Sequence, residues 1–173
     1  ENGSRTDYTY SNDHGGILTA TLPAPSPSAD RPQTRYSYLP VHPWYKNISG
    51  VIVEWGPITL LSGTSACATG TSCAGTAAEV TTSIVYGSPG VANNLNPTKI
   101  TAGSGSGDLV VATTATYDVN GDRIAVDGPL VGASHTSTYI YDLARKLVGS
   151  IGPDPDGAGP GLNRGERVTY NAR

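Results

Sequence analysis

The stretch Tyr117-Asp118-Val119-Asn120-Gly121-Asp122-Arg123-Ile124 contains the local pattern that decides the fold. A strand-forming tyrosine is followed by an aspartate able to close an Asx turn, by a glycine where the chain reverses, and by the residues of a second strand. This order predicts a β-hairpin with tyrosine on one face. Because a lone hairpin cannot bury its own face, the pattern also predicts further hairpins beside it.

The same order of residues recurs elsewhere in the chain. Tyrosine strands lead into Ser11-Asn12-Asp13-His14-Gly15-Gly16 and into Asp142-Leu143-Ala144-Arg145, and Thr169-Tyr170-Asn171 opens another copy. Three departures stand out: Asp122 is inserted before Arg123, Ser11 replaces the aspartate, and the Tyr141 copy lacks the glycine. The repetition predicts structural roles for Tyr8, Tyr10, Tyr36, Tyr38, Tyr117, Asp118, Gly121, Arg123, Tyr139, Tyr141, Asp142, Tyr170 and Asn171.

Alternating apolar and polar residues, interrupted by turn residues, predict a series of short strands. The expected strands cover residues 7–10, 17–22, 34–38, 51–55, 58–61, 80–86, 98–102, 109–117, 123–127, 138–141, 146–151 and 167–170. Strands this close in sequence favour antiparallel hairpins. Long loops are expected at 23–32, which is rich in proline, and at 62–79, which contains both cysteines. Neither loop marks a domain boundary, so we expect a single module over residues 1–173.

The composition agrees with a β-rich chain. With 22 Gly and 13 Pro among 173 residues, long helices are disfavoured. No apolar stretch has the roughly 18 residues of a membrane-spanning helix, and a net charge of -3 provides no broad basic face for nucleic acid. There are 10 Tyr, 2 Trp and no Phe, so aromatic burial depends on tyrosines, whose hydroxyl groups need hydrogen-bond partners.

The repeated pattern resembles the rearrangement-hotspot (RHS) proteins, also called tyrosine-aspartate (YD) repeat proteins. The resemblance is carried by Tyr117-Asp118 with Gly121 and Arg123, by Tyr139 with Tyr141-Asp142, and by Thr169-Tyr170-Asn171. It covers residues 7–38 and 115–173, with β-rich sequence between them. The resemblance implies an all-β fold, in which antiparallel hairpin repeats form an extended, spiralling sheet that serves as a shell wall or a fibre module.

The resemblance also implies a function and a location. Proteins of this family are long bacterial chains, exported or on the cell surface, that often form a hollow shell around a carboxy-terminal toxin. The self-cleaving protease segment of the family has no counterpart in this sequence, so we expect a structural or encapsulating segment without enzymatic activity or cofactor. The expected partners are neighbouring repeats or identical copies, joined by β-strand pairing, and a toxin enclosed by a longer parent chain.

The ends of the chain leave two arrangements open. Residues 167–173 begin a repeat, and residues 1–10 start with a turn-like Asn-Gly before a strand, so that end to end they make about one complete unit. Either the carboxy terminus of one copy pairs beside the amino terminus of the next in a filament, or the chain is a fragment of a longer polypeptide.

The two cysteines, Cys67 and Cys73, lie in a loop rich in Gly, Ser and Thr. Taken alone, the pair is compatible with free thiols, with a disulfide or with a poor metal site, since no nearby His or second Cys pair completes a zinc ligand set. The exported context implied by the family resemblance favours the disulfide.

Catalytic and metal-binding motifs are weak. His14, His42 and His135 lie in unrelated turns or loops, with no metal-ligand spacing and no nucleophile motif beside them. Asp118, Asn120 and Asp122 imitate the start of a calcium loop, but the glycine is at the fourth position instead of the sixth. A turn is therefore the preferred interpretation, and calcium remains a side hypothesis here and at 154–161. We expect no metal site.

The alternative function is an adhesive or carbohydrate-binding module. Trp44, Tyr45 and Trp55 are the residues that could stack on sugar rings, although packing within the sheet is the preferred explanation for them. A glycosidase would need two converging carboxylates, and the candidates are Glu54, Glu79, Asp127 and Glu166. Sequence alone does not place any two of them at catalytic separation.

Overall fold

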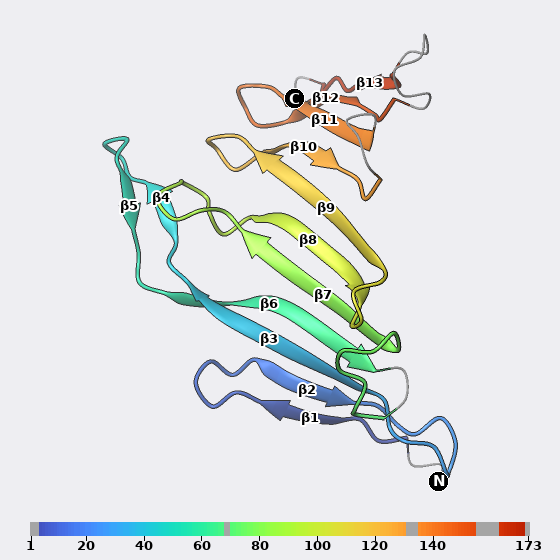
Figure 1. Ribbon diagram of the computed structural model, residues 1–173. Coiled ribbons are helices and arrows are strands. Elements are labelled where there is room, and N and C mark those ends of the chain that lie inside the picture. The colour runs from blue at the N-terminus through green and yellow to red at the C-terminus, as the bar shows by residue number, and fades with distance from the viewer. Residues whose placement is uncertain (1–3, 68–69, 131–134, 155–162, 172–173) are drawn as a thin grey trace. The chain divides into compact units, whose positions relative to one another are not determined.

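The computed structural model describes residues 4–67, 70–130, 135–154 and 163–171. These residues form an all-β structure with a large antiparallel sheet and no α-helix, which confirms the predicted class (Figure 1). The strands are β1 Asp7–Tyr10, β2 Ile17–Thr21, β3 Gln33–Val41, β4 Trp44–Lys46, β5 Ile52–Glu54, β6 Ile58–Cys67, β7 Glu79–Tyr86, β8 Pro97–Ser104, β9 Val110–Tyr117, β10 Arg123–Asp127, β11 Thr136–Tyr141, β12 Leu147–Ile151 and β13 Gly165–Arg167.

The strands hydrogen-bond in the order β1-β2-β3-β6-β7-β8-β9-β10-β11-β12-β13, and the sheet is not closed. Strands β4 and β5 form a separate two-stranded sheet between β3 and β6 in the sequence. The chain divides into two compact units. The first contains Glu1–His42, Gly56–Val85 and Ile100–Val111, and the second contains Pro43–Trp55, Tyr86–Lys99 and Ala112–Arg173.

Most predicted strands are present, and the differences have local causes. Strands β1 and β10 have the predicted bounds. Strand β6 extends to Cys67 because it pairs with β3 from Ile58 to Cys67 and with β7 from Gly63 to Cys67, so the loop predicted from residue 62 begins later. Strand β4 was not predicted, since it has three residues and directly follows Pro43. Strand β13 spans Gly165–Arg167 instead of residues 167–170.

The centre of the first unit is the long β3–β6 pair, continued on the other side of β6 by β7. Gly63 permits close packing there, because a Cβ atom at this position would lie 2.5 Å from the carbonyl oxygen of Thr82. Such a distance is impossible for a real side chain without moving the backbone. A residue without a side chain is therefore needed where β6 meets β7.

Arg31 fixes the proline-rich loop between β2 and β3. Its guanidinium group donates hydrogen bonds to the carbonyl oxygens of Arg5, Thr21 and Leu22 and forms an ion pair with Asp7. This hydrogen-bonded guanidinium holds the pKa of the Asp7 carboxyl below its usual value. A loop that cannot enter the sheet is thus attached to its edge by one side chain.

Few side chains are buried in the part of the chain that the structure describes. The buried side chains are those of Ala20, Cys67, Cys73, Glu79 and Asn94, whereas large apolar residues such as Leu109 and Val119 are more than half exposed. The hydrophobic core is consequently small, and main-chain ladders, turns and side-chain hydrogen bonds must contribute much of the structural specificity. Within the described ranges, no helix is long and apolar enough to cross a membrane.

Candidate functional site

Four tyrosines form the same hydrogen bond in successive parts of the sheet. Each tyrosine lies within three residues of the end of its strand, and its hydroxyl group donates to the backbone carbonyl oxygen of the first residue of the preceding strand in the sheet. The pairs are Tyr38 with Ile17 (2.9 Å), Tyr117 with Pro97 (3.0 Å), Tyr141 with Arg123 (3.1 Å) and Tyr170 with Leu147 (2.9 Å). Each tyrosine therefore ties its strand to the point where the neighbouring strand begins.

The other predicted tyrosines are placed differently. Tyr8 and Tyr10 are more than half exposed, with ring centroids 6.4 Å apart on β1. The Tyr139 ring lies 5.3 Å from the guanidinium carbon of Arg123, a cation–π geometry. Tyr36 is half-buried on β3. These residues belong to the strands of the repeat but do not make the tyrosine–carbonyl hydrogen bond.

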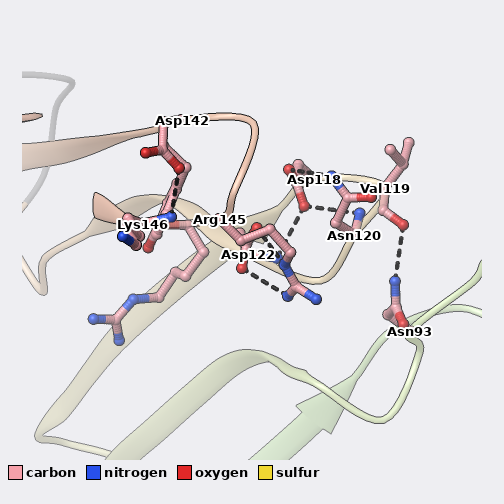
Figure 2. Close-up of polar contacts among 10 residues, drawn as sticks. Asn93, Asp118, Val119, Asn120, Asp122, Asp142, Arg145 and Lys146 are labelled. Atoms are coloured by element: carbon pink, nitrogen blue, oxygen red, sulfur yellow. Dashed lines mark hydrogen bonds and ion pairs between the residues drawn. The ribbon is translucent and has the colours of Figure 1, made fainter. Parts of the chain in front are cut away.

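Asp118 closes the turn between β9 and β10, as predicted from the sequence. Its Oδ1 atom accepts hydrogen bonds from the backbone N–H groups of Asn120 and Asp122, both at 2.9 Å (Figure 2). The backbone closes the same turn, since the N–H of Gly121 donates to the carbonyl of Asp118. Gly121 has φ +85°, a left-handed conformation in which glycine is favoured.

Asp142 builds an equivalent turn between β11 and β12, although this copy has no glycine. Its Oδ1 atom accepts from the N–H groups of Ala144 and Lys146, both at 2.9 Å. Arg145 occupies the position of Gly121 and has φ 62°. The two turns have the same length, so the inserted residue and the missing glycine noted in the sequence do not change the hairpin register here.

One ion pair joins these two turns. The Arg145 side chain donates from Nε and from a terminal nitrogen to the two carboxylate oxygens of Asp122, at 2.9 and 2.7 Å (Figure 2). The hydrogen bond from Arg145 holds the pKa of the Asp122 carboxyl below its usual value, and the same hydrogen bond raises the pKa of Arg145. A planar two-point contact of this kind fixes orientation as well as distance.

A third turn of this type was not predicted from the sequence. Asn47 Oδ1 accepts from the N–H groups of Ser49 and Val51, both at 3.0 Å, and Gly50 has φ +79°. The signal was present, because Asn47 and Gly50 have the same spacing as Asp118 and Gly121. In the other two turns a tyrosine directly precedes the aspartate, whereas Lys46 precedes Asn47, so this turn lacks the tyrosine-aspartate pair.

The three candidate sugar-stacking residues do not share one surface. Tyr45 and Trp55 are 41% and 65% exposed, and their rings meet edge to face at 6.5 Å and 61°. Trp44 is half-buried, and its backbone N–H and C=O bond to Asn94 Oδ1 (2.7 Å) and to the N–H of Asn93 (2.9 Å). Two of the three residues therefore remain as an exposed aromatic pair, whereas Trp44 anchors the β4–β5 hairpin.

Cys67 and Cys73 form the disulfide that the family resemblance favours, with Cα atoms 5.7 Å apart. Next to it, the nearly buried Glu79 accepts hydrogen bonds from the Ser65 hydroxyl and from the N–H of Gly75 (2.7 Å). The Ser65 hydrogen bond is the main reason that the pKa of Glu79 lies below its usual value. Glu79 thus holds the disulfide loop against β6, a role that its sequence context did not reveal.

Among the remaining carboxylates, Asp127 and Glu166 lie too far apart for a glycosidase pair. Asp127 lies on β10 and Glu166 on β13, with two strands between them, a separation of roughly 14 Å at the usual strand spacing. A glycosidase pair needs a shorter distance. His14 Nδ1 accepts from the N–H of Gly16, and no group of three His, Cys, Asp or Glu side chains in the described residues is placed to hold a metal. The possible calcium turn at 154–161 lies mostly outside the described residues.

No protein-family model matches the sequence, and no curated protein is significantly similar to it.

Proposed function

We propose that this chain is a structural wall segment of an RHS/YD-repeat protein, exported by a bacterium or carried on its surface. Its hairpins continue a spiralling sheet that forms part of a shell or a filament, by strand pairing with neighbouring repeats or identical copies. In a longer parent chain, such a shell encloses a carboxy-terminal toxin. The proposed role is mechanical and requires no catalytic residue or cofactor.

The tyrosine–carbonyl hydrogen bond is the observation that carries this proposal. It recurs four times at equivalent places, and the two best-matched copies also share an Asx turn of the same length. A unit whose key side chains bond to the backbone of the preceding unit is suited to serial extension. The residues of the repeat are thereby occupied in building the sheet, and none of these contacts requires a ligand.

The small core supports the same function. Large apolar side chains such as Val80, Leu109, Val110 and Ile140 are exposed in the chain taken alone. Where such side chains adjoin one another, an exposed apolar surface is suited to being covered by other protein. A wall segment has such neighbours above, below or beside it, which explains how the sequence can lack a deep core.

Electron microscopy of the purified chain, together with its mass in solution, tests the proposal. We expect filaments, curved sheets or discrete oligomers whose repeat corresponds to stacked strands. A compact monomer at concentrations up to the millimolar range would contradict assembly of identical copies. In that case, electron microscopy of a longer polypeptide that contains this segment should show the segment within the wall of a shell or fibre. A segment that lies outside any shell or fibre would contradict the proposal altogether.

Carbohydrate binding is the second candidate, favoured by the exposed Tyr45–Trp55 pair. A sugar ring can stack on the free face of Trp55, with Tyr45 at its edge. Binding to a glycan array that is lost in Trp55→Ala would support this function. The control is Leu143→Ala, which removes an apolar side chain that is more exposed than Trp55, from the turn closed by Asp142. Equal loss of binding in both variants would contradict specific recognition.

A further inference from the structure

The last strand, β13, is paired on one side. The N–H of Gly152 donates to the carbonyl oxygen of Arg164 at 2.7 Å, and the N–H of Val168 donates to the carbonyl oxygen of Val148 at 3.0 Å. Glu166, midway between them, is opposite Ser150 in the same register. In an antiparallel ladder, hydrogen-bonded pairs alternate. Residues 164, 166 and 168 therefore direct their backbone groups toward β12.

The same alternation leaves a second set of backbone groups on the outer edge. The N–H and C=O groups of Gly165, Arg167 and Thr169 face away from β12. Among the described residues, β13 ends the strand order, and Gly165–Arg167 are exposed (Figure 1). An exposed row of alternating donors and acceptors is a template for another strand.

A groove lies at this end of the sheet, and its lining runs from Ile140 on β11 across β12 to β13 and the residues that follow it. Its volume is about 740 Å³, and its apolar lining includes Ile140, Val148 and Val168, with Lys146 and Glu166 among the charged residues that also line it. The Lys146 ammonium lies 5.1 Å from the Tyr170 ring centroid, which fixes that ring at the edge of the groove. The groove therefore offers an apolar surface with charges of both signs to a chain segment laid along the edge.

The two preceding hairpins of the same unit indicate what fills such a place. Tyr117-Asp118 and Tyr141-Asp142 are each followed by a strand, β10 or β12, that runs antiparallel to the tyrosine strand. Tyr170-Asn171 has the same residue order, and Tyr170 makes the same hydrogen bond to the preceding strand. The corresponding neighbour of residues 165–169 is thus a strand of the β10 or β12 type.

We propose that the outer edge of residues 165–169 binds a β-strand from a further repeat, antiparallel to it and with apolar residues at alternate positions. Its backbone pairs with Gly165, Arg167 and Thr169, and its apolar side chains enter the groove lined by Val148 and Val168. This inference rests on the proposed wall function and specifies its growing edge, polarity and register. It assigns recognition to backbone groups, so the identity of the Arg167 side chain is unimportant.

The first experiment uses a labelled peptide with the sequence of residues 144–152, Ala-Arg-Lys-Leu-Val-Gly-Ser-Ile-Gly, and a scrambled peptide as control. We expect saturable binding of the β12-type peptide to the whole chain, roughly tenfold tighter than the scrambled one. Amide hydrogen exchange should slow at Gly165, Arg167 and Thr169 on binding, whereas the already paired Glu166 changes little. Protection confined to β1, or equal binding of both peptides, would overturn the inference.

A pair of variants separates the backbone from the side chain. Arg167→Pro removes an outward N–H without removing a bond to β12, and should weaken peptide binding roughly tenfold or more. Arg167→Ala keeps the N–H and should bind like the native chain. Continued protection of the Val168 N–H shows that β13 remains paired in both variants. If Arg167→Pro binds the peptide as tightly as the native chain does, the inference is wrong. If β13 no longer pairs with β12 in that variant, the amide exchange of Gly165, Arg167 and Thr169 in the native chain with bound peptide decides the question.

The two proposals fail differently. Assembly of the chain that persists unchanged in Arg167→Pro would refute this edge as the growing one while leaving the wall function intact. Peptide binding at residues 165–169 by a chain that never forms a shell or fibre would support the edge and contradict the wall function.

Discussion

Replacing Tyr117 by phenylalanine tests whether the repeated hydroxyl group stabilises the sheet. Tyr117→Phe preserves the ring but removes the 3.0 Å hydrogen bond to the carbonyl oxygen of Pro97. A hydrogen bond of this kind contributes about 1 kcal/mol net. We therefore expect a loss of about 1 kcal/mol in the free energy of unfolding, which lowers the midpoint temperature by about 2–4 °C for a chain of this length.

Urea denaturation measures this change in the free energy of unfolding. The slope of that free energy against urea concentration should be the same for the native chain and the variant. Tyr45→Phe is the matched control, because Tyr45 is exposed and its hydroxyl group makes no hydrogen bond with the described residues. The control should change stability by less than about 0.5 kcal/mol. Removing the hydroxyl groups of Tyr38, Tyr141 and Tyr170 as well should bring the total loss to about 4 kcal/mol, since the four bonds are distinct. Equal effects of Tyr117→Phe and Tyr45→Phe would refute the reasoning.

Three further predictions concern single contacts. Gly63→Ala should destabilise the chain by about 1–3 kcal/mol, because its Cβ would lie 2.5 Å from the carbonyl oxygen of Thr82. Gly56→Ala should be nearly neutral in the same thermal melt, because a Cβ atom there meets nothing within 4 Å. The folded pKa of Glu79 is lowered, so its ionised form stabilises the fold above the unfolded pKa, and this contribution is lost as the pH falls through the folded value. Glu79→Gln should consequently flatten the decline in stability below about pH 4.5; an unchanged acid decline would contradict that role. Asp122→Asn should lower the free energy of unfolding of the native chain, but it should have little effect on a chain that already carries Arg145→Gly, because the ion pair is then absent. Additive effects of the two substitutions in this double-mutant cycle would show that the ion pair does not couple the turns.

The sequence was sufficient to predict the class and much of the local structure. Alternation and turn residues gave the bounds of β1 and β10, and the Asx-turn chemistry of Asp118 was recognised correctly. These features depend on residues close in sequence, where the physical preferences of individual side chains dominate. Short-range patterns are therefore the part of this fold that sequence reasoning recovers well.

The tyrosine–carbonyl hydrogen bonds were not predictable in the same way. Their acceptors are backbone atoms 18 to 23 residues earlier in the chain, and every residue type supplies such an atom. Nothing in the identities of Ile17, Pro97, Arg123 or Leu147 marks them as acceptors. The repetition of tyrosine is visible in the sequence, but its role as a hydrogen-bond donor can be identified only when the register of the strands is known. Similarly, the role of Glu79 depends on the approach of β6 to the disulfide loop.

Two departures from the repeated pattern prove to be one interaction. Asp122 and Arg145 each appeared to be a local irregularity, yet their side chains form a two-point ion pair between consecutive turns. Arg145 adopts the left-handed conformation of the missing glycine within a turn closed by Asp142. Since a shift of one residue would move every side chain of a strand to the opposite face, a contact that links two turns opposes such a slip. The irregular residues thus stabilise the register that the regular tyrosines require, and an isolated change at either position should disturb the repeat more than its place in an exposed turn suggests.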